Sequence, residues 1–247
     1  NHNGKIKNAI KLIDKAASSG ADYVKFQHTN PNLISESAKK ADYQIKNTKS
    51  GESQRDMIKK LHLNWKKAYP ILLKRCKKKK IKFLTSVFSK KDYLWIKKYN
   101  LDYIKIPSGE IINTPLLEEI SKSNKQIILS TGMANVQEIT EALKVLGKKC
   151  DVKKKVTLMH CVTAYPTPYK DVNLLSIPYL REKFKLNIGL SDHSLGIEVP
   201  VSSISLGVNI IEKHFTLSKK LPGPDHSASL EPKEFKKMAN YIRNIEL

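Results

Sequence analysis

Short β-rich runs alternate with amphipathic helical patterns along almost the whole chain, and this alternation constrains the fold more than any other feature. The runs are predicted to be seven strands, at 21–27, 82–88, 103–108, 126–131, 156–162, 187–192 and 210–216. Helical patterns separate most of them, so successive strands are expected to run parallel with the helices packed outside the sheet.

Several residues mark where the helices should begin and end. The first amphipathic helix is predicted to end at Gly20. Asn135 is a suitable N-cap for a later helix that Gly147 closes. Pro232 suits the first turn of a last helix. These signals support a regular succession of strands and helices.

Seven strands, with an eighth expected just before Asn1, predict a (β/α)₈ TIM barrel whose first strand is missing or truncated. The first residues carry neither an initiating Met nor a signal-peptide pattern, so we expect the chain to be cut there. A doubly wound sheet is the alternative, but no G-x-G-x-x-G turn follows the first predicted strand. No linker or compositional break appears, so residues 1–247 are predicted to form one domain.

Composition narrows the classes of function. The net charge is +22, yet the lysines are spread along the chain and no basic–aromatic interleaving is present, so solvated surface explains the charge better than nucleic-acid binding does. No apolar run is long enough to span a bilayer. Three cysteines without C-x-x-C spacing favour a reducing compartment, and we expect a cytoplasmic protein.

Polar side chains end nearly every predicted strand. A barrel places the carboxyl ends of all its strands on one face, so these groups are expected to converge there. They are Lys25, Gln27, Thr85, Ser86, Lys105, Ser108, Glu110, Ser130, Thr131, His160, Thr163, Ser191, Asp192, His193, Lys213, His214 and Thr216. The polar segment 28–63 is predicted to be a long loop over the barrel mouth that contains helices of its own.

Lysines and hydroxyls at such a site suit a phosphate and a carboxylate, because both supply hydrogen bonds to anionic oxygens. His193 and His214 are candidates for one divalent metal, although histidines are more often structural. Glu110 could move a proton or hold a sugar hydroxyl. Asp225 lies in a stiff Pro-Gly-Pro turn, where an ordinary surface position is the simpler interpretation.

Long motifs then identify a family. They are NHNG (1–4), GADYVKFQ (20–27), YIKIPSGEIINTPLL (103–117), IILSTGMA (127–134), HCVTAYPTPY (160–169), GLSDHSLG (189–196), EKHFT (212–216) and LPGPDHSASLEP (221–232). With these motifs the chain resembles the N-acetylneuraminate (sialic acid) synthase family, which includes legionaminate and pseudaminate synthases. The resemblance covers nearly the whole chain.

The resemblance implies a transferase that forms a C–C bond on a TIM barrel. Such an enzyme joins phosphoenolpyruvate to an N-acylated amino sugar, N-acetylmannosamine or a close analogue, and releases phosphate. The expected metal is Mn²⁺, with Mg²⁺ or Co²⁺ as alternatives, and its implied ligands are His193 and His214. Those two histidines, Glu110 and Lys105 are the implied catalytic residues.

The remaining implied roles concern substrate binding. The phosphoenolpyruvate site would comprise Lys25, Ser86, Lys105, Ser108, Ser130, Thr163 and Ser191, where Thr163 replaces the family's frequent Asn. The sugar site would comprise Gln27, Glu110, Tyr165 and Asp225.

Two family features are expected to lie outside this chain. They are the first-strand Glu and a C-terminal antifreeze-like domain that lends an Arg to a partner subunit. The full-length protein is therefore expected to be a homodimer, with no nucleic-acid or membrane partner.

Two alternative functions remain at this point. One is a related condensing barrel that uses phosphoenolpyruvate and another aldose. The other is a basic barrel that binds nucleic acid without chemistry. The residues do not specify which amino sugar is the acceptor; N-acetylmannosamine, its 2,4-diacetamido-6-deoxy analogue and the pseudaminate precursor all stay open.

Overall fold

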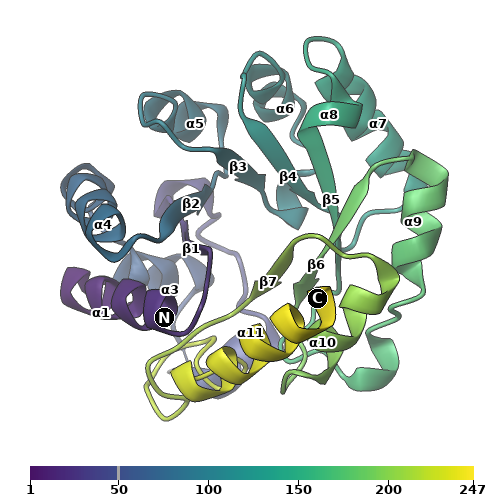
Figure 1. The fold of residues 1–247 in the computed structure, drawn as a ribbon. Helices are drawn as coiled ribbons and strands as arrows, with labels where there is room; N and C mark the ends of the chain where they lie inside the picture. The colour runs from purple at the N-terminus through teal and green to yellow at the C-terminus, as the bar shows by residue number, and fades with distance from the viewer. Residues whose placement is uncertain (49–50) are drawn as a thin grey trace.

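In residues 1–48 and 51–247, which the computed structural model describes, seven strands form one parallel sheet in the chain order β1 to β7. The strands are β1 (Tyr23–Gln27), β2 (Lys82–Ser86), β3 (Tyr103–Ile106), β4 (Gln126–Ser130), β5 (Val156–Cys161), β6 (Asn187–Asp192) and β7 (Ile211–Lys213). All seven match predicted runs. The sheet curls into a ring that the helices surround (Figure 1), which confirms the TIM-barrel prediction.

The helices alternate with the strands as expected. They are α1 (Ile6–Ser18), α2 (Asp42–Asn47), α3 (Gln54–Leu61), α4 (Trp65–Lys79), α5 (Lys90–Ile96), α6 (Thr114–Ser121), α7 (Val136–Gly147), α8 (Val152–Lys155), α9 (Ser176–Phe184), α10 (Glu198–Ser203) and α11 (Pro232–Glu246). Short 3₁₀ turns lie at Pro31–Leu33, Ser108–Glu110, Tyr169–Asp171 and Ile204–Leu206.

The predicted helix boundaries have clear local causes. The Asn135 side chain accepts a hydrogen bond from the Glu138 N–H at 2.9 Å, and the Glu138 carboxylate accepts one from the Asn135 N–H at 2.8 Å. This reciprocal capping box starts α7. Pro232 occupies the first position of α11, where its missing N–H costs nothing.

The ring is open between β1 and β7, which form the two edges of the sheet. Asn1 lies beside this opening, because its side-chain amide donates to the Phe215 carbonyl oxygen at 2.8 Å, just after β7. The opening fits the expectation of a strand placed before Asn1 in the barrel.

Among the described residues the hydrophobic core comprises three clusters: one contains Leu230 with Met238 and Ile242 of α11, and the other two, a larger and a smaller one, pack on the strands. The larger one lies between the strands and the surrounding helices and includes Ile104, Ile106 and Leu158. The smaller one comprises Leu84, Ile128 and Met159, with Tyr23, Tyr103 and Ile210 packed against it. At Gly189, a Cβ would collide with the Met159 sulfur and the Ile210 carbonyl oxygen, so glycine permits the close approach of neighbouring strands.

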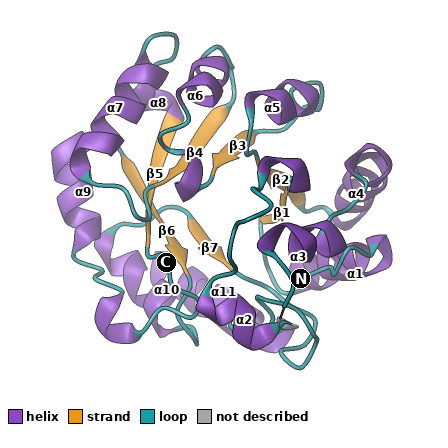
Figure 2. Cartoon of the chain, turned by 180° about the vertical axis from the view of Figure 1, so that it is seen from behind, coloured by secondary structure: helices purple, strands orange, loops and turns teal. Residues whose placement is uncertain are grey.

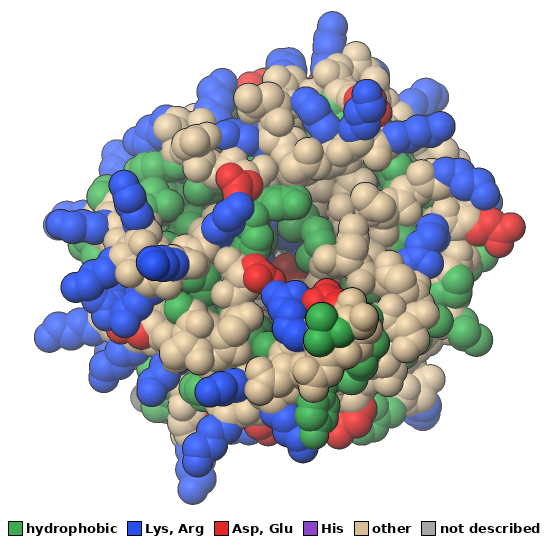
Figure 3. All heavy atoms as spheres, viewed as in Figure 1, with side chains coloured by type: hydrophobic (Ala, Val, Ile, Leu, Met, Phe, Trp, Pro, Cys, Tyr) green, Lys and Arg blue, Asp and Glu red, His purple; other side chains and the backbone are tan. Residues whose placement is uncertain are grey.

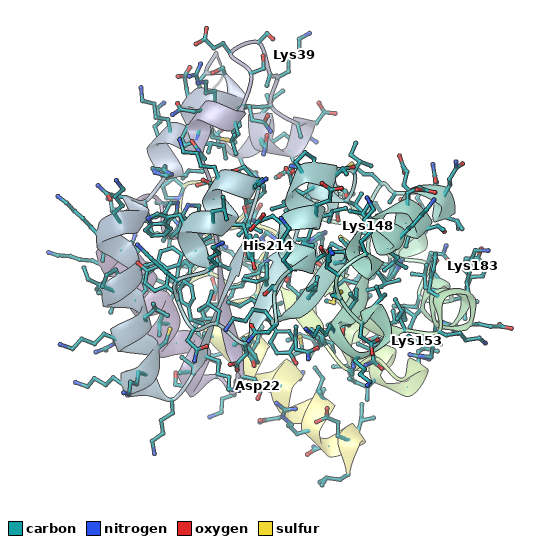
Figure 4. All side chains as sticks on the ribbon, turned by 90° about the horizontal axis from the view of Figure 1, so that it is seen from above. Asp22, Lys39, Lys148, Lys153, Lys183 and His214 are labelled. Atoms are coloured by element: carbon teal, nitrogen blue, oxygen red, sulfur yellow. The ribbon has the colours of Figure 1, made fainter. Side chains whose placement is uncertain are left out.

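The segment from 28 to 63 leaves β1 and returns to α4, and it contains α2 and α3 as predicted. These helices lie behind the sheet in Figure 1 and nearer the viewer in Figure 2. Figure 4 shows His214 near the middle of the molecule, between Lys39 of this segment and Asp22 before β1. The segment therefore covers the end of the barrel at which the strands finish.

Lys and Arg side chains are scattered around the outline of the molecule in Figure 3, not gathered into a stripe. Among the described residues, no helix has the length and apolarity that crossing a bilayer requires.

Candidate active site

Two imidazoles meet where β6 and β7 end. His193 directly follows β6 and His214 directly follows β7, and the register that pairs Asp192 with Lys213 aligns the two strand ends. The ring centroids lie 5.3 Å apart with the rings nearly perpendicular, at 85°. The two sequence-predicted metal ligands are therefore neighbours in space although 21 positions separate them in the chain (214 − 193 = 21).

Both imidazoles are held in the neutral form. Burial and the nearby His214 together lower the pKa of His193 to about 4. Burial, together with the charge of Lys25, likewise lowers the pKa of His214 to about 4. His193 Nδ1 lies 2.7 Å from the Val162 carbonyl oxygen, which can only accept, so Nδ1 carries the hydrogen and Nε2 keeps its lone pair.

A neutral imidazole with a free Nε2 and an Nδ1–H bound to a carbonyl has the chemistry of a metal ligand. The pair fits a divalent ion in this respect. Within residues 1–48 and 51–247, no group of three or more His, Cys, Asp and Glu side chains is placed to hold a metal.

A charge cluster lies beside the histidines and joins four strands of the ring, β1, β3, β6 and β7. The Glu212 carboxylate accepts hydrogen bonds from Lys25 at 2.7 Å and from Lys105 at 3.1 Å. The Ser191 hydroxyl donates to the same carboxylate at 3.1 Å. The Lys105 side chain is 2% exposed, whereas those of Lys25 and Glu212 are 20% and 16% exposed, so the cluster is buried at Lys105 and partly open at its other two members.

The charges in this cluster do not cancel. Burial alone would raise the pKa of Glu212, but Lys105 and Lys25 hold it well below its usual range, so Glu212 is ionised. Burial lowers the pKa of Lys105 while Glu212 opposes that shift. With both lysines protonated, the cluster carries one net positive charge, which favours an incoming anion.

Hydroxyl groups from neighbouring strand ends surround this cluster. Ser86, in register with Lys105, is 1% exposed, and its Oγ finds no hydrogen-bond partner among the described residues. The Gly132 N–H donates to Ser108 Oγ at 3.1 Å. A Cβ on Gly132 would lie 2.9 Å from that oxygen and 2.5 Å from Thr163 Oγ1, so the three residues are tightly grouped. Ser130 ends β4 and is buried.

The four predicted sugar-binding residues lie in different surroundings. The Tyr165 ring packs 4.1 Å from the His193 ring and 5.6 Å from the His214 ring, centroid to centroid. Asp225 Oδ2 lies 3.9 Å from His214 Nδ1, so the Pro-Gly-Pro turn does bring this residue to the histidines. Gln27 is exposed at the end of β1.

Glu110 lies in the 3₁₀ turn after β3, and its carboxylate accepts a hydrogen bond from the Asn113 side chain at 2.6 Å. Burial raises its pKa. A carboxyl with a raised pKa is suited to hold a proton closer to neutral pH.

Some strand-end residues do not converge, and for these the prediction was wrong. Thr85 accepts from the Tyr69 hydroxyl of α4, and His160 Nε2 donates to the Val172 carbonyl oxygen beneath α9. Lys213 pairs with Asp192 instead of facing the site. Successive side chains of a strand point to opposite faces, so every second residue at a strand end turns toward the helices.

Sequence reasoning also missed residues that lie at the site. Glu212 was recognised only as part of the EKHFT motif, although two lysines on other strands, one of them buried, require a counter-charge. Cys161 entered the sequence analysis only through the cysteine spacing, yet its sulfur lies 3.9 Å from His193 Nδ1. Tyr43, in the 28–63 segment, packs on Tyr165.

Known proteins are similar to this chain along almost its whole length. A family model described as the NeuB family matches residues 12–247. The chain is 49% identical to N,N'-diacetyllegionaminic acid synthase of Campylobacter jejuni over 247 residues, all of this chain and 74% of that protein. The crystal structure of an N-acetylneuraminic acid (sialic acid) synthetase from Leptospira borgpetersenii, in complex with citrate, superposes with a TM-score of 0.86 at 34% identity, over 99% of this chain and 80% of that one.

A more distant structure supports the fold alone. A truncated 3-deoxy-D-arabino-heptulosonate 7-phosphate synthase from Thermotoga maritima superposes with a TM-score of 0.71 at 15% identity, over 98% of this chain and 82% of that one. The family match and the 49% identity over the full chain go further than fold. This chain belongs to the NeuB family.

Proposed function

We propose that this protein is an enzyme that condenses phosphoenolpyruvate with an N-acylated amino sugar to give a sialic-type keto acid and phosphate. The observation that carries the proposal is the cluster of Lys25, Lys105 and Glu212, which keeps one net positive charge beside two neutral imidazoles. This arrangement would place an anion site beside a metal site. Membership of the NeuB family supports the same activity.

Phosphoenolpyruvate would bind at the charge cluster. Lys25 and Lys105 each offer a charge-assisted hydrogen bond to the phosphate or the carboxylate. The unpartnered Ser86 hydroxyl and Ser191 add neutral donors, and Ser108, Ser130 and Thr163 extend the same set. The net positive charge favours the substrate anion over neutral sugars at this position.

The sugar would bind against Tyr165 and Asp225, which contact the imidazoles. Gln27 and Glu110 would complete its hydrogen bonds. His193 and His214 would hold a divalent ion, Mn²⁺ in our proposal, which supplies a Lewis acid for the sugar aldehyde. Glu110, whose pKa burial raises, would hold a proton near the reacting groups.

The proposed reaction balances without a redox partner. C3 of phosphoenolpyruvate forms a bond to the aldehyde carbon of the open-chain sugar, and the aldehyde oxygen takes up a proton to become a hydroxyl. Water then adds to C2, the C2–O bond to the phosphate breaks, and phosphate leaves. Lys25 and Lys105 would hold the phosphate before and after that cleavage.

Among the acceptors that the sequence leaves open, we propose the 2,4-diacetamido-6-deoxy analogue of N-acetylmannosamine. The chain is 49% identical to a protein named N,N'-diacetyllegionaminic acid synthase and 34% identical to the sialic acid synthetase of known structure. We further propose a single barrel domain over residues 1–247 and a homodimeric, cytoplasmic enzyme.

The complete gene product, incubated with phosphoenolpyruvate, Mn²⁺ and each candidate sugar in turn, tests this proposal. Phosphate release that requires a sugar, together with a product whose mass equals sugar plus phosphoenolpyruvate plus water minus phosphoric acid, would support it. The same assay with Lys105→Met tests the charge cluster, and the exposed Lys183→Met variant is its matched control. Phosphate release without any sugar, or none with all three, would count against the assignment.

A further inference from the structure

The helix α2 reaches the candidate site through a single aromatic side chain. The Tyr43 ring lies 5.0 Å from the Tyr165 ring, centroid to centroid, with 30° between their planes. Tyr165 in turn packs 4.1 Å from the His193 ring. Two tilted ring contacts therefore link the 28–63 segment to His193, one of the two candidate metal ligands.

The position of Tyr43 is fixed by its neighbours in α2. Gln44 Nε2 donates to the Tyr43 hydroxyl at 3.2 Å, and Gln44 itself is buried. Its Oε1 accepts from the Ala41 N–H at 3.0 Å, at the start of the helix. The hydrogen bond from Gln44 fixes the position of the Tyr43 ring, and because the hydroxyl only accepts in it, both the ring and the O–H group can contact a ligand.

The same helix is anchored to the turn that carries Asp225. Asn47 Nδ2 donates to the Pro224 carbonyl oxygen at 2.7 Å and to the Ser227 hydroxyl at 3.1 Å. Burial raises the pKa of the Tyr43 phenol, and the charge of Asp225 also raises it, so the two side chains are close enough to interact electrostatically. Tyr43, Tyr165 and Asp225 thus border one space beside His214.

We propose that Tyr43 is a specificity-determining residue for the sugar, and that its ring face contacts an acylamino or methyl substituent of the acceptor. This inference rests on the proposed function and deepens it. An aromatic ring offers a broad apolar surface with a polar tip. A sugar with a second acylamino group and a methyl group places more apolar surface against that ring than a sugar with hydroxyls in their place.

The surroundings argue against a role in phosphoenolpyruvate binding. The charge cluster is built from β1, β3, β6 and β7, and its partners are Lys25, Lys105, Ser191 and Glu212. Tyr43 contacts Tyr165 instead. Its removal should therefore affect the two substrates unequally.

The experiment compares Tyr43→Ala and Tyr43→Phe in the complete gene product with two acceptors, N-acetylmannosamine and its 2,4-diacetamido-6-deoxy analogue. Tyr43→Ala is expected to lower kcat/KM for the diacetamido sugar roughly 10-fold or more, because losing apolar contact in a pocket has effects of this size. The selectivity ratio between the sugars should fall, and KM for phosphoenolpyruvate should stay within about two-fold. Tyr43→Phe keeps the ring and should keep the ratio.

Tyr241→Ala, at an exposed aromatic residue on α11, is the matched control and should change neither ratio nor KM. An unchanged selectivity ratio in Tyr43→Ala, or equal losses for sugar and phosphoenolpyruvate, would overturn the inference. Calorimetric titration of both sugars without phosphoenolpyruvate tests the same contact independently of turnover. If the unmodified protein condenses no sugar, the proposed function fails; if it does and Tyr43→Ala keeps the ratio, only the specificity role fails.

Discussion

Removing either partner of the buried ion pair between Asp192 and Lys213 should be one of the most destabilising single substitutions and should disturb the geometry of the histidines. Their side chains are 2% and 1% exposed, respectively, and they face each other across neighbouring positions of β6 and β7. Lys213 Nζ also donates to the Ser194 carbonyl oxygen at 2.5 Å, and Asp192 Oδ1 accepts from the Ser194 N–H at 2.9 Å. The pair therefore holds both residues that flank His193.

Asp192→Asn removes the negative partner and leaves a buried ammonium group without a counter-charge. Breaking a buried pair in this way costs about 3–5 kcal/mol of unfolding free energy. We expect Lys213→Met to cost a similar amount, and the double variant to cost less than the two single losses added together, because it leaves no unpaired charge. The affinity for Mn²⁺ should fall in both single variants, since β6 and β7 would no longer hold His193 and His214 in register.

Urea unfolding followed by circular dichroism measures the stability, and calorimetric titration measures the metal affinity. The control is Glu141→Gln, which breaks an ion pair with Lys144 whose side chains are 59% and 73% exposed and which should change stability by at most about 1 kcal/mol. A loss for Asp192→Asn no larger than that of the control, with unchanged metal affinity, would refute the reasoning.

Three further predictions follow from the site and the fold. His193→Ala and His214→Ala should each abolish metal-dependent turnover and weaken Mn²⁺ binding while the circular dichroism spectrum stays the same; full activity without added metal in either variant would contradict this. Lys105→Met should weaken phosphoenolpyruvate binding by about 1.5–3 kcal/mol and sugar binding much less, as measured by separate titrations with Lys183→Met as the control. Burial lowers the pKa of His28 from 6.5 to about 4, so its neutral form stabilises the fold above pH 6.5 and that stability is lost as the pH falls toward 4. In unfolding measurements His28→Gln should make this loss smaller but not remove it, because burial also lowers the pKa of His193 and His214 to about 4.

The strands were predictable because each reads as a short, mostly apolar run between helical patterns. Strands buried on both faces have this appearance whatever their neighbours. The strand ends were less predictable. The last run was expected at 210–216, but β7 ends at Lys213, because beyond it the chain forms a bridge between Phe215 and Leu230.

The chemical type of the site could also be predicted, since lysines, hydroxyls and histidines recur at strand ends. The direction of each side chain could not, because it depends on where each strand starts its alternation. Glu212 is the clearest example of a site residue whose position the sequence alone could not predict. Its partners Lys25 and Lys105 lie 187 and 107 positions away in the chain, and only the curling of the sheet (Figure 1) brings β1, β3 and β7 together.

The measurement that tests the central claim most directly follows the oxygen of the released phosphate. The complete gene product is incubated with phosphoenolpyruvate, Mn²⁺ and the diacetamido sugar in water enriched in the heavy oxygen isotope, and the phosphate is analysed by mass spectrometry. If water attacks C2 and the C2–O bond breaks, the phosphate keeps the oxygens of phosphoenolpyruvate and carries no label, and its release requires the sugar. Phosphate that carries the heavy isotope would mean that water attacks phosphorus, and phosphate that appears without sugar would mean hydrolysis without condensation. Either result would contradict condensation at the cluster of Lys25, Lys105 and Glu212.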